Sequence, residues 1–280
     1  MKLILILCIS IIVDALWVNN ALAWGPAIHT VTALSVLDNV GFILPSIAGI
    51  ITSLPLEYLY GCLSADFFIG KSRGRGAGRH LHNWEGGLRL LGEAGDDREA
   101  SYAYGFLSHL AADVVAHNFF VPNVISSYPT GKRVGHVFCE AKADYLVGPN
   151  YIRIARDVLA MDHKGCDELL KLITGKRHNR LMAKKRLFTQ SVRASDYIYS
   201  AHNSLFAGKM IRRGAFDKYL VLMVDLSCRL VRDFLSNPES SPCLSYDPVV
   251  RQSLYLARRK GLFAKLYGPR RRPRGFTVDQ

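Results

Sequence analysis

Residues 101–122 read SYAYGFLSHLAADVVAHNFFVP, and this stretch decides the fold class. Acidic residues just before it suit the start of a helix, and Pro122 suits its end. His109, Asp113 and His117 follow one another at steps of four residues. Positions i, i+4 and i+8 of an α-helix lie along one face. The sequence therefore predicts a helix that carries two imidazoles and a carboxylate on one side.

A second stretch, Val134–Val147, repeats the step of four with His136, Glu140 and Asp144, and Gly148-Pro149 closes it. Divalent metals such as zinc bind nitrogen and oxygen ligands that converge from rigid elements. The alternative is that these are core histidines with satisfied hydrogen bonds and a surface carboxylate. Further candidate ligands upstream favour the metal site.

The first 23 residues are typical of a secretory signal. A basic Lys2 precedes the apolar run Leu3–Val13, and residues 21–23 form a small-x-small cleavage site. The run is too short to span a bilayer, and a retained anchor is the alternative. We expect export to the periplasm or the medium, with Trp24 as the first residue after cleavage.

Cleavage at this point has a chemical consequence. A free α-amine has a pKa near ~8, so its neutral form binds a metal at modest cost, and the adjacent carbonyl oxygen completes a chelate. Pro26 suits the first turn of a helix, and His29 follows one turn in. By itself, however, Trp24 would be interpreted as a buried aromatic residue.

With these residues assembled, the chain resembles the zinc-dependent phospholipase C family, in the superfamily that includes the S1/P1 nucleases. Five separated motifs agree in their order along the chain: Trp24-Gly-x-x-x-His29, Ser64-Ala-Asp66, His82-Asn-Trp84, Ser108-His109-x-x-x-Asp113-x-x-x-His117 and His136-x-x-x-Glu140.

This resemblance implies an all-α fold with three zinc ions in a cleft between helices. It implies one site from Trp24 (amine and carbonyl), His29 and Asp113, a second from Asp66, His80 or His82, His109 and Asp113, and a third from His117, His136 and Glu140. Asp113 would bridge two ions, and Asp66 would orient or deprotonate the attacking water or act only as a ligand.

Two features refine the resemblance. In the bacterial phospholipases C and the nucleases, the two histidines that correspond to His109 and His117 lie further apart in the sequence. The shorter step found here resembles that of the glycosylphosphatidylinositol-specific phospholipase D branch and its bacterial relatives. His80 and His82 both precede Asn83-Trp84, and the His-Trp context favours His82 as the ligand. His80 stays open as an alternative ligand or as a residue behind the ligands.

The 257 residues after position 23 are enough for one large domain, and 49% of the chain is apolar. We expect one helical domain over 24–266 and a basic, disordered tail over 267–280. Apolar residues at helical spacing predict helices near 27–39, 55–63, 84–94, 99–119, 135–147, 150–160, 165–173, 183–206, 215–235 and 248–264.

Five cysteines remain after cleavage, an odd number for an exported protein, and none has Cys-x-x-Cys spacing. The net charge is +13, and much of it follows residue 176. A basic surface attracts phospholipid headgroups or nucleic acid, although each single run is also explained as a solvated face. Arg73, Arg75 and Arg79 lie between Asp66 and His82, so they are candidates for binding phosphate.

Three functions follow. The first is a zinc-dependent phosphodiester hydrolase that cleaves phospholipids at a membrane surface by phospholipase C-type chemistry. The second is a single-strand nuclease of the S1/P1 kind, which needs aromatic platforms for bases and is favoured less by the histidine spacing. The third is a zinc-stabilised domain that binds membranes without turnover. No protein partner is inferred.

Overall fold

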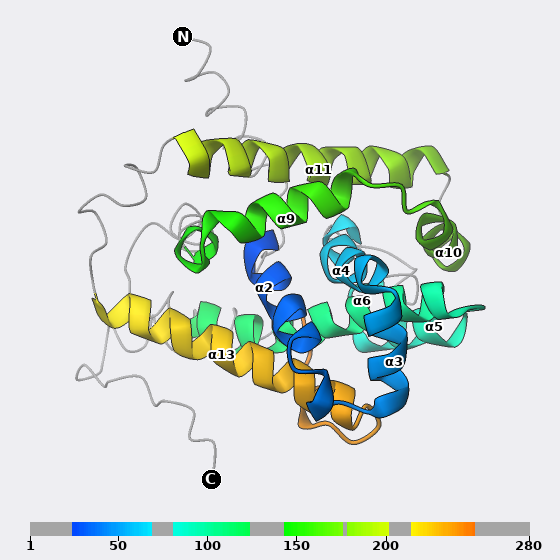
Figure 1. Cartoon of the computed structure of the whole chain (residues 1–280), viewed down its shortest axis with the longest axis horizontal. Helices are drawn as coiled ribbons and strands as arrows, with labels where there is room; N and C mark the ends of the chain where they lie inside the picture. Colours follow the sequence, from blue (N-terminus) through cyan, green and yellow to red (C-terminus); the bar gives the residue numbers. More distant parts are fainter. Residues whose placement is uncertain (1–23, 69–80, 124–142, 176–177, 202–213, 250–280) are drawn as a thin grey trace, which may run out of the picture.

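A computed structural model describes residues 24–68, 81–123, 143–175, 178–201 and 214–249 (Figure 1). Within these ranges the chain contains helices and no strand, which confirms the predicted all-α class. The predicted leader (1–23), the predicted tail (267–280), most of the predicted helix 135–147 and nearly all of 248–264 lie outside the described residues; 143–147 are helical.

The described elements include α-helices and single turns of other helix types. In chain order they are α2 (Pro26–Leu37), η1 (Val40–Phe42), α3 (Pro45–Ser53), α4 (Pro55–Ser64), η2 (Ala65–Phe68), α5 (Trp84–Gly92), α6 (Asp97–Val115), η4 (Ala116–Phe120), α9 (Pro149–Ala160), α10 (Lys164–Thr174), α11 (His178–Ala201), α13 (Gly214–Ser236) and η6 (Pro242–Ser245).

Helix α6 is the centre of the fold. Every residue from 101 to 117 except Tyr104 is buried, because the helix is apolar on nearly all sides and must be covered by neighbours. Helix α4 packs against it most extensively, and α13, α5 and α2 cover other parts of its surface. Helices α9 and α11 lie side by side and continue the bundle beyond α2 (Figure 1).

Two glycines allow α4 and α6 to cross at close range. A Cβ on Gly61 would lie 2.0 Å from the carbonyl oxygen of Tyr102, and a Cβ on Gly105 would lie 2.0 Å from that of Tyr58. The obstacles are backbone atoms, which cannot rotate away. The crossing brings the end of α4, where Asp66 follows, beside the half of α6 that carries the predicted ligands.

Gly61→Ala is expected to lower the free energy of unfolding by about 3 kcal/mol, because the helices must separate to accept the methyl group. Gly49→Ala in α3 is the matched control, since nothing lies within 4 Å of the added atom. The control should be neutral or stabilising by up to about 1 kcal/mol. Urea unfolding of both variants measures the difference, and equal effects would contradict the close crossing.

Helix α3 was not among the predicted helices. Its sequence, PSIAGIITS, is rich in β-branched residues and shows no clear polar face, and only Ile47 and Ile51 are buried. Tertiary packing against α6 and α4 stabilises it as a helix. In the described ranges no single helix is long and apolar enough to cross a membrane; the pair Pro45–Ser53 and Pro55–Phe67 passes by length and composition together, but it is bent by 94°.

Candidate metal centre

His109 on α6 is held in a defined tautomer. Its Nδ1 lies 2.7 Å from the carbonyl oxygen of Cys62 on α4. A carbonyl only accepts hydrogen bonds, so Nδ1 carries the proton and donates it. The other nitrogen, Nε2, then presents a lone pair to the interior of the bundle. This is the arrangement by which proteins orient a histidine for metal binding.

Asp113, one turn further along α6, lies at the centre of four imidazoles. Its Oδ2 is 3.2 Å from Nε2 of His109, 3.1 Å from Nε2 of His82 and 3.9 Å from Nε2 of His117. Its Oδ1 is 3.4 Å from Nε2 of His29 on α2. All five side chains are buried. The carboxylate therefore faces a ring of nitrogen donors from α2, α6, the following turn and the segment before α5.

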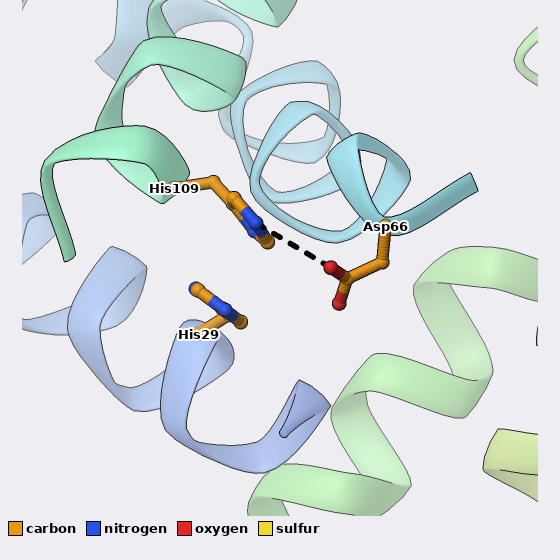
Figure 2. A group of neighbouring side chains, drawn as sticks. All are labelled: His29, Asp66 and His109. Atoms are coloured by element: carbon orange, nitrogen blue, oxygen red, sulfur yellow. Dashed lines mark ion pairs between the residues drawn. The ribbon is translucent and has the colours of Figure 1, made fainter. Parts of the chain in front are cut away.

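Asp66 adds a second carboxylate from the turn after α4. Its Oδ1 lies 3.5 Å from Nε2 of His109. Figure 2 shows His29, Asp66 and His109 converging from three separate elements. The His29 and His109 rings stack, with centroids 3.7 Å apart and an interplanar angle of 16°. Residues 29, 66 and 109 thus face one another although 80 positions of sequence separate the first from the last.

The donor set fits a divalent cation. Ligand atoms of His29, Asp66 and His109 all lie within 4.8 Å of one another, as do those of His82, His109 and Asp113. Bonds of about 2.0 Å in a tetrahedral site separate ligand atoms by about 3.3 Å, close to the spacing found here. Nε2 of His29 and Oδ1 of Asp113 are buried and have no hydrogen-bond partner among the residues that the structure describes. Buried polar atoms without partners are rare and costly, and a cation between them would satisfy both.

His82 reaches the cluster from the segment before α5. Its Nε2 is 3.1 Å from Nε2 of His109, a contact between two nitrogens that both also approach Asp113. The next residue, Asn83, caps α5 by accepting a hydrogen bond of 2.7 Å from the backbone N–H of Gly86. The structure thus places His82 in the cluster, while His80 lies outside the described residues.

Trp24, the predicted first residue after cleavage, is buried at the start of α2. Its indole Nε1 donates to Oγ of Ser227 on α13 over 3.1 Å, and its ring lies 4.5 Å from that of Phe120. The burial of this residue directly after a predicted leader agrees with its interpretation as a buried aromatic. Ligation by its amine and carbonyl stays a prediction.

The sequence model of the family described as zinc dependent phospholipase C matches residues 28–190, more than half of the chain. The chain belongs to this family. The match confirms the resemblance inferred from the motifs, and it spans the candidate ligands from His29 to Glu140. No curated protein and no solved structure matches the chain.

His117 follows a local change of helix type. Helix α6 is regular to Val115, and Ala116–Phe120 then form a π-helical turn. The sequence predicted a regular helix through this region and gave no sign of the wider turn. Such π-turns occur frequently at functional sites of proteins, where they redirect a side chain. The predicted partners of His117, namely His136 and Glu140, lie outside the described residues, so the third zinc site stays a prediction.

No thiol of a described cysteine belongs to either group of candidate ligands. Cys62, Cys166, Cys228 and Cys243 are buried, and none of them forms a disulfide. Burial raises the pKa of the Cys166 thiol to about 12 and that of Cys243 to about 11, so both stay protonated. The candidate centre of this family member is therefore built from nitrogen and oxygen donors, as zinc, and divalent metals generally, accept. The fifth cysteine expected after cleavage, Cys139, lies outside the described residues.

Sequence reasoning missed the groups that support the ligands. The carbonyl of Cys62 orients His109, and Ser227 holds Trp24 from a position 203 residues away. A carbonyl is present in every residue and a serine is common, so neither carries a sequence signal. The candidate phosphate-binding residues Arg73, Arg75 and Arg79 lie outside the described residues.

The two carboxylates of the cluster differ in their electrostatics. Burial raises the pKa of Asp66 to about 7; the imidazole of His109 lowers it, and the carboxylates of Asp113 and Asp144 raise it further. Burial also acts on Asp113, but its electrostatic interaction with His109 and its contacts with His109, His29 and His82 outweigh it, and its pKa lies well below the usual range. In the metal-free fold Asp113 is therefore ionised across the neutral range, whereas Asp66 keeps its proton until the pH approaches about 7.

The raised pKa of Asp66 predicts a pH dependence of the metal-free protein. Because the folded state binds this proton more tightly than the unfolded state does, the stabilisation is complete below pH 3.8 and is lost as the pH rises through about 7. Between pH 3.8 and about pH 7, the free energy of unfolding of the wild type should therefore fall by more than about 1 kcal/mol relative to that of Asp66→Asn.

Urea unfolding in the presence of chelator, across that pH range, measures this difference. Asp225→Asn is the control, because that carboxylate is exposed and pairs with Arg229 on the surface. A difference between wild type and Asp66→Asn that does not change with pH would contradict the prediction. Saturating zinc should abolish the trend, since a ligating carboxylate must be ionised.

Proposed function

We propose that this chain is an exported zinc-dependent phosphodiester hydrolase that cleaves phospholipids by phospholipase C-type chemistry. Family membership and the grouping of potential metal ligands support the assignment as a metal-dependent hydrolase. The substrate, the position of the cleaved bond and the export of the protein are our proposals. The single observation that carries the proposal is the convergence of four histidines on Asp113, where two buried ligand atoms have no hydrogen-bond partner in the described part of the chain.

Asp113 would hold two cations at a set separation. Its two oxygens face different histidines: Oδ1 faces His29, and Oδ2 faces His82 and His109. Asp113 would therefore contribute one oxygen to a site with His29 and the other to a site with His82 and His109. Bound zinc supplies positive charge for the phosphoryl oxygens and lowers the pKa of a coordinated water towards ~7.

Asp66 would manage the proton of the attacking water. It stands at the edge of the cluster, 3.5 Å from His109, and its pKa is raised to about 7 by burial in the metal-free fold. With zinc bound, Asp66 would be ionised, and its carboxylate would orient the attacking water or accept its proton. If Asp66 serves only as a ligand, its replacement will lower metal content and turnover together.

The substrate class follows from the family and from charge. Phospholipid headgroups are anionic at the phosphate, and the chain carries a net charge of +13. Basic surfaces attract anionic membranes through screened long-range forces. The Lys71–Arg79 segment, which contains the candidate residues Arg73, Arg75 and Arg79, lies between Asp66 and His82 in sequence and would meet the phosphate.

The test uses protein purified by secretion, with its amino terminus established by sequencing. It is incubated with vesicles of phosphatidylcholine or phosphatidylinositol and with single-stranded DNA, each with and without chelator. Release of diacylglycerol that stops on chelation and returns with zinc is the expected result. Phosphatidic acid in place of diacylglycerol would assign cleavage to the other side of the phosphate.

The remaining outcomes contradict the proposal in distinct ways. Cleavage of DNA without lipid turnover would make the protein a nuclease of the S1/P1 kind. Tight zinc binding with no turnover of any of the three would make it a zinc-stabilised binding domain. A protein that binds no zinc, with its native start intact, would remove the metal centre altogether.

A further inference from the structure

Asp144 is a buried carboxylate that binds the start of α2. It is 3% exposed. Its Oδ2 accepts a hydrogen bond of 3.2 Å from the backbone N–H of Ala27, and its Oδ1 accepts one of 3.1 Å from that of Ile28. These N–H groups belong to the first turn, where a helix offers donors that have no partner four residues back.

Among the described residues, no side chain close in sequence to Pro26 caps this helix. The residue at the cap position is Gly25, which has no side chain, and Pro26 has no N–H. Asp144, 116 positions after Ile28, takes the place of a local cap. Carboxylates are favoured at this end of a helix by the aligned backbone dipoles. The start of α2 is therefore held by a residue that comes four positions after the predicted ligand Glu140 in sequence.

The carboxylate of Asp144 occupies the space that a side chain at Gly25 would need. A Cβ on Gly25 would lie 2.2 Å from Oδ2 of Asp144 and 2.4 Å from its Cγ. The backbone of Gly25 has φ of −82°, a conformation that any residue adopts. The presence of glycine at position 25 is therefore explained by the close approach of the carboxylate and not by a need for positive φ.

The turn that Asp144 holds also carries part of the metal cluster. His29 directly follows Ile28, and its Nε2 lies 3.4 Å from Oδ1 of Asp113. Trp24, the predicted source of an amine ligand, directly precedes Gly25. A shift of this turn would move both residues relative to α6, while His109 and Asp113 would stay in place on their own helix.

We propose that Asp144 is a positioning residue of the metal centre. It fixes the first turn of α2 so that His29 and Trp24 are presented to the cations, and Gly25 provides the space in which it does so. This inference rests on the proposed metal centre. A positioning residue differs from a purely structural helix cap in the effect of its removal. Loss of a cap lowers only the stability of the fold, whereas loss of a positioning residue also weakens metal binding.

Asp144→Asn is the main variant. The amide oxygen can still accept one hydrogen bond, but its NH₂ group would face the second N–H. We expect zinc to bind 10- to 100-fold more weakly, the range typical of groups that orient metal ligands. Competition with a chromogenic chelator measures the dissociation constant, and the visible spectrum of the cobalt-loaded protein should change with the geometry of the site.

Asp96→Asn is the matched control. Asp96 caps α6 by accepting a hydrogen bond of 2.8 Å from the backbone N–H of Glu99, at the end of the helix far from His109. This variant also replaces a capping carboxylate by its amide, but it should change zinc affinity by less than about twofold. Comparison of the two variants separates loss of stability from loss of positioning.

Gly25→Ala gives an independent arm, because its methyl group would displace the carboxylate without altering it. It should weaken zinc binding in the same direction, and the double variant Gly25→Ala/Asp144→Asn should be little worse than either single one. If Asp144→Asn does not fold, Gly25→Ala decides the question.

Zinc affinity and cobalt spectra equal to wild type in the folded variants would overturn the proposal and leave Asp144 a cap. This result is distinct from failure of the proposed function, in which the wild type itself would bind no zinc.

Discussion

Asp113→Asn is expected to abolish turnover, with a loss of at least about 10³-fold, and to remove two metal ions per chain. The carboxylate contacts the imidazoles of His29, His82, His109 and His117 together. An amide of the same shape has no negative charge to hold two cations. Metal counted by mass spectrometry and diacylglycerol release from vesicles measure the two effects.

Asp167→Asn is the matched control for this change. Asp167 is also a buried carboxylate, but it pairs with Lys185 over 2.6 Å and accepts a hydrogen bond from the Tyr60 hydroxyl, away from the cluster. Its loss should lower the melting temperature while metal content stays the same. Full metal content in Asp113→Asn would show that the carboxylate does not bridge ions.

A chain that retains residues before Trp24 is expected to lose one zinc per molecule and about 10²-fold in activity. A free amine, with a pKa near ~8, can bind metal in its neutral form, whereas a peptide nitrogen cannot. Trp24 is 1% exposed and its indole is bonded to Ser227, so the residue that would carry the amine is itself held in place.

The sharpest form of this experiment uses one preparation before and after processing. A short extension with a protease site that leaves Trp24 as the first residue is purified, loaded with zinc, and then cleaved. Metal content and lipid turnover should rise together on cleavage. An extended chain that is already fully active would rule out the amine as a ligand.

Much of the helical fold could be predicted because its helices have local signals. The step from His109 to His117 and the acidic residues before them predicted α6, and Pro55 and Pro149 lie at the starts of α4 and α9 as proline does at first helical positions. Helix α3 was missed because its residues favour a strand locally and only packing makes them helical. The π-turn at Ala116–Phe120 was missed because its residues show the same helical spacing as those before it.

The types of ligand could also be predicted, since metal chemistry restricts them to a few residues at recurrent spacings. His109 and Asp113 share a face by helical geometry alone. What the spacing could not give is which atoms meet. That Oδ1 of Asp113 faces His29 while Oδ2 faces His82 depends on how α2 and the segment before α5 pack against α6.

By itself, then, the amino-acid sequence determined the all-α class, the family and the kinds of donor that the centre uses, because these follow from short-range periodicity and from residue chemistry. Only the tertiary structure decided that Cys62 orients His109, that Ser227 holds Trp24 and that Asp144 holds the turn before His29. The physical reason is that these contacts join positions 47 to 203 residues apart and use backbone or common polar groups. Such groups acquire a role only when packing brings them together.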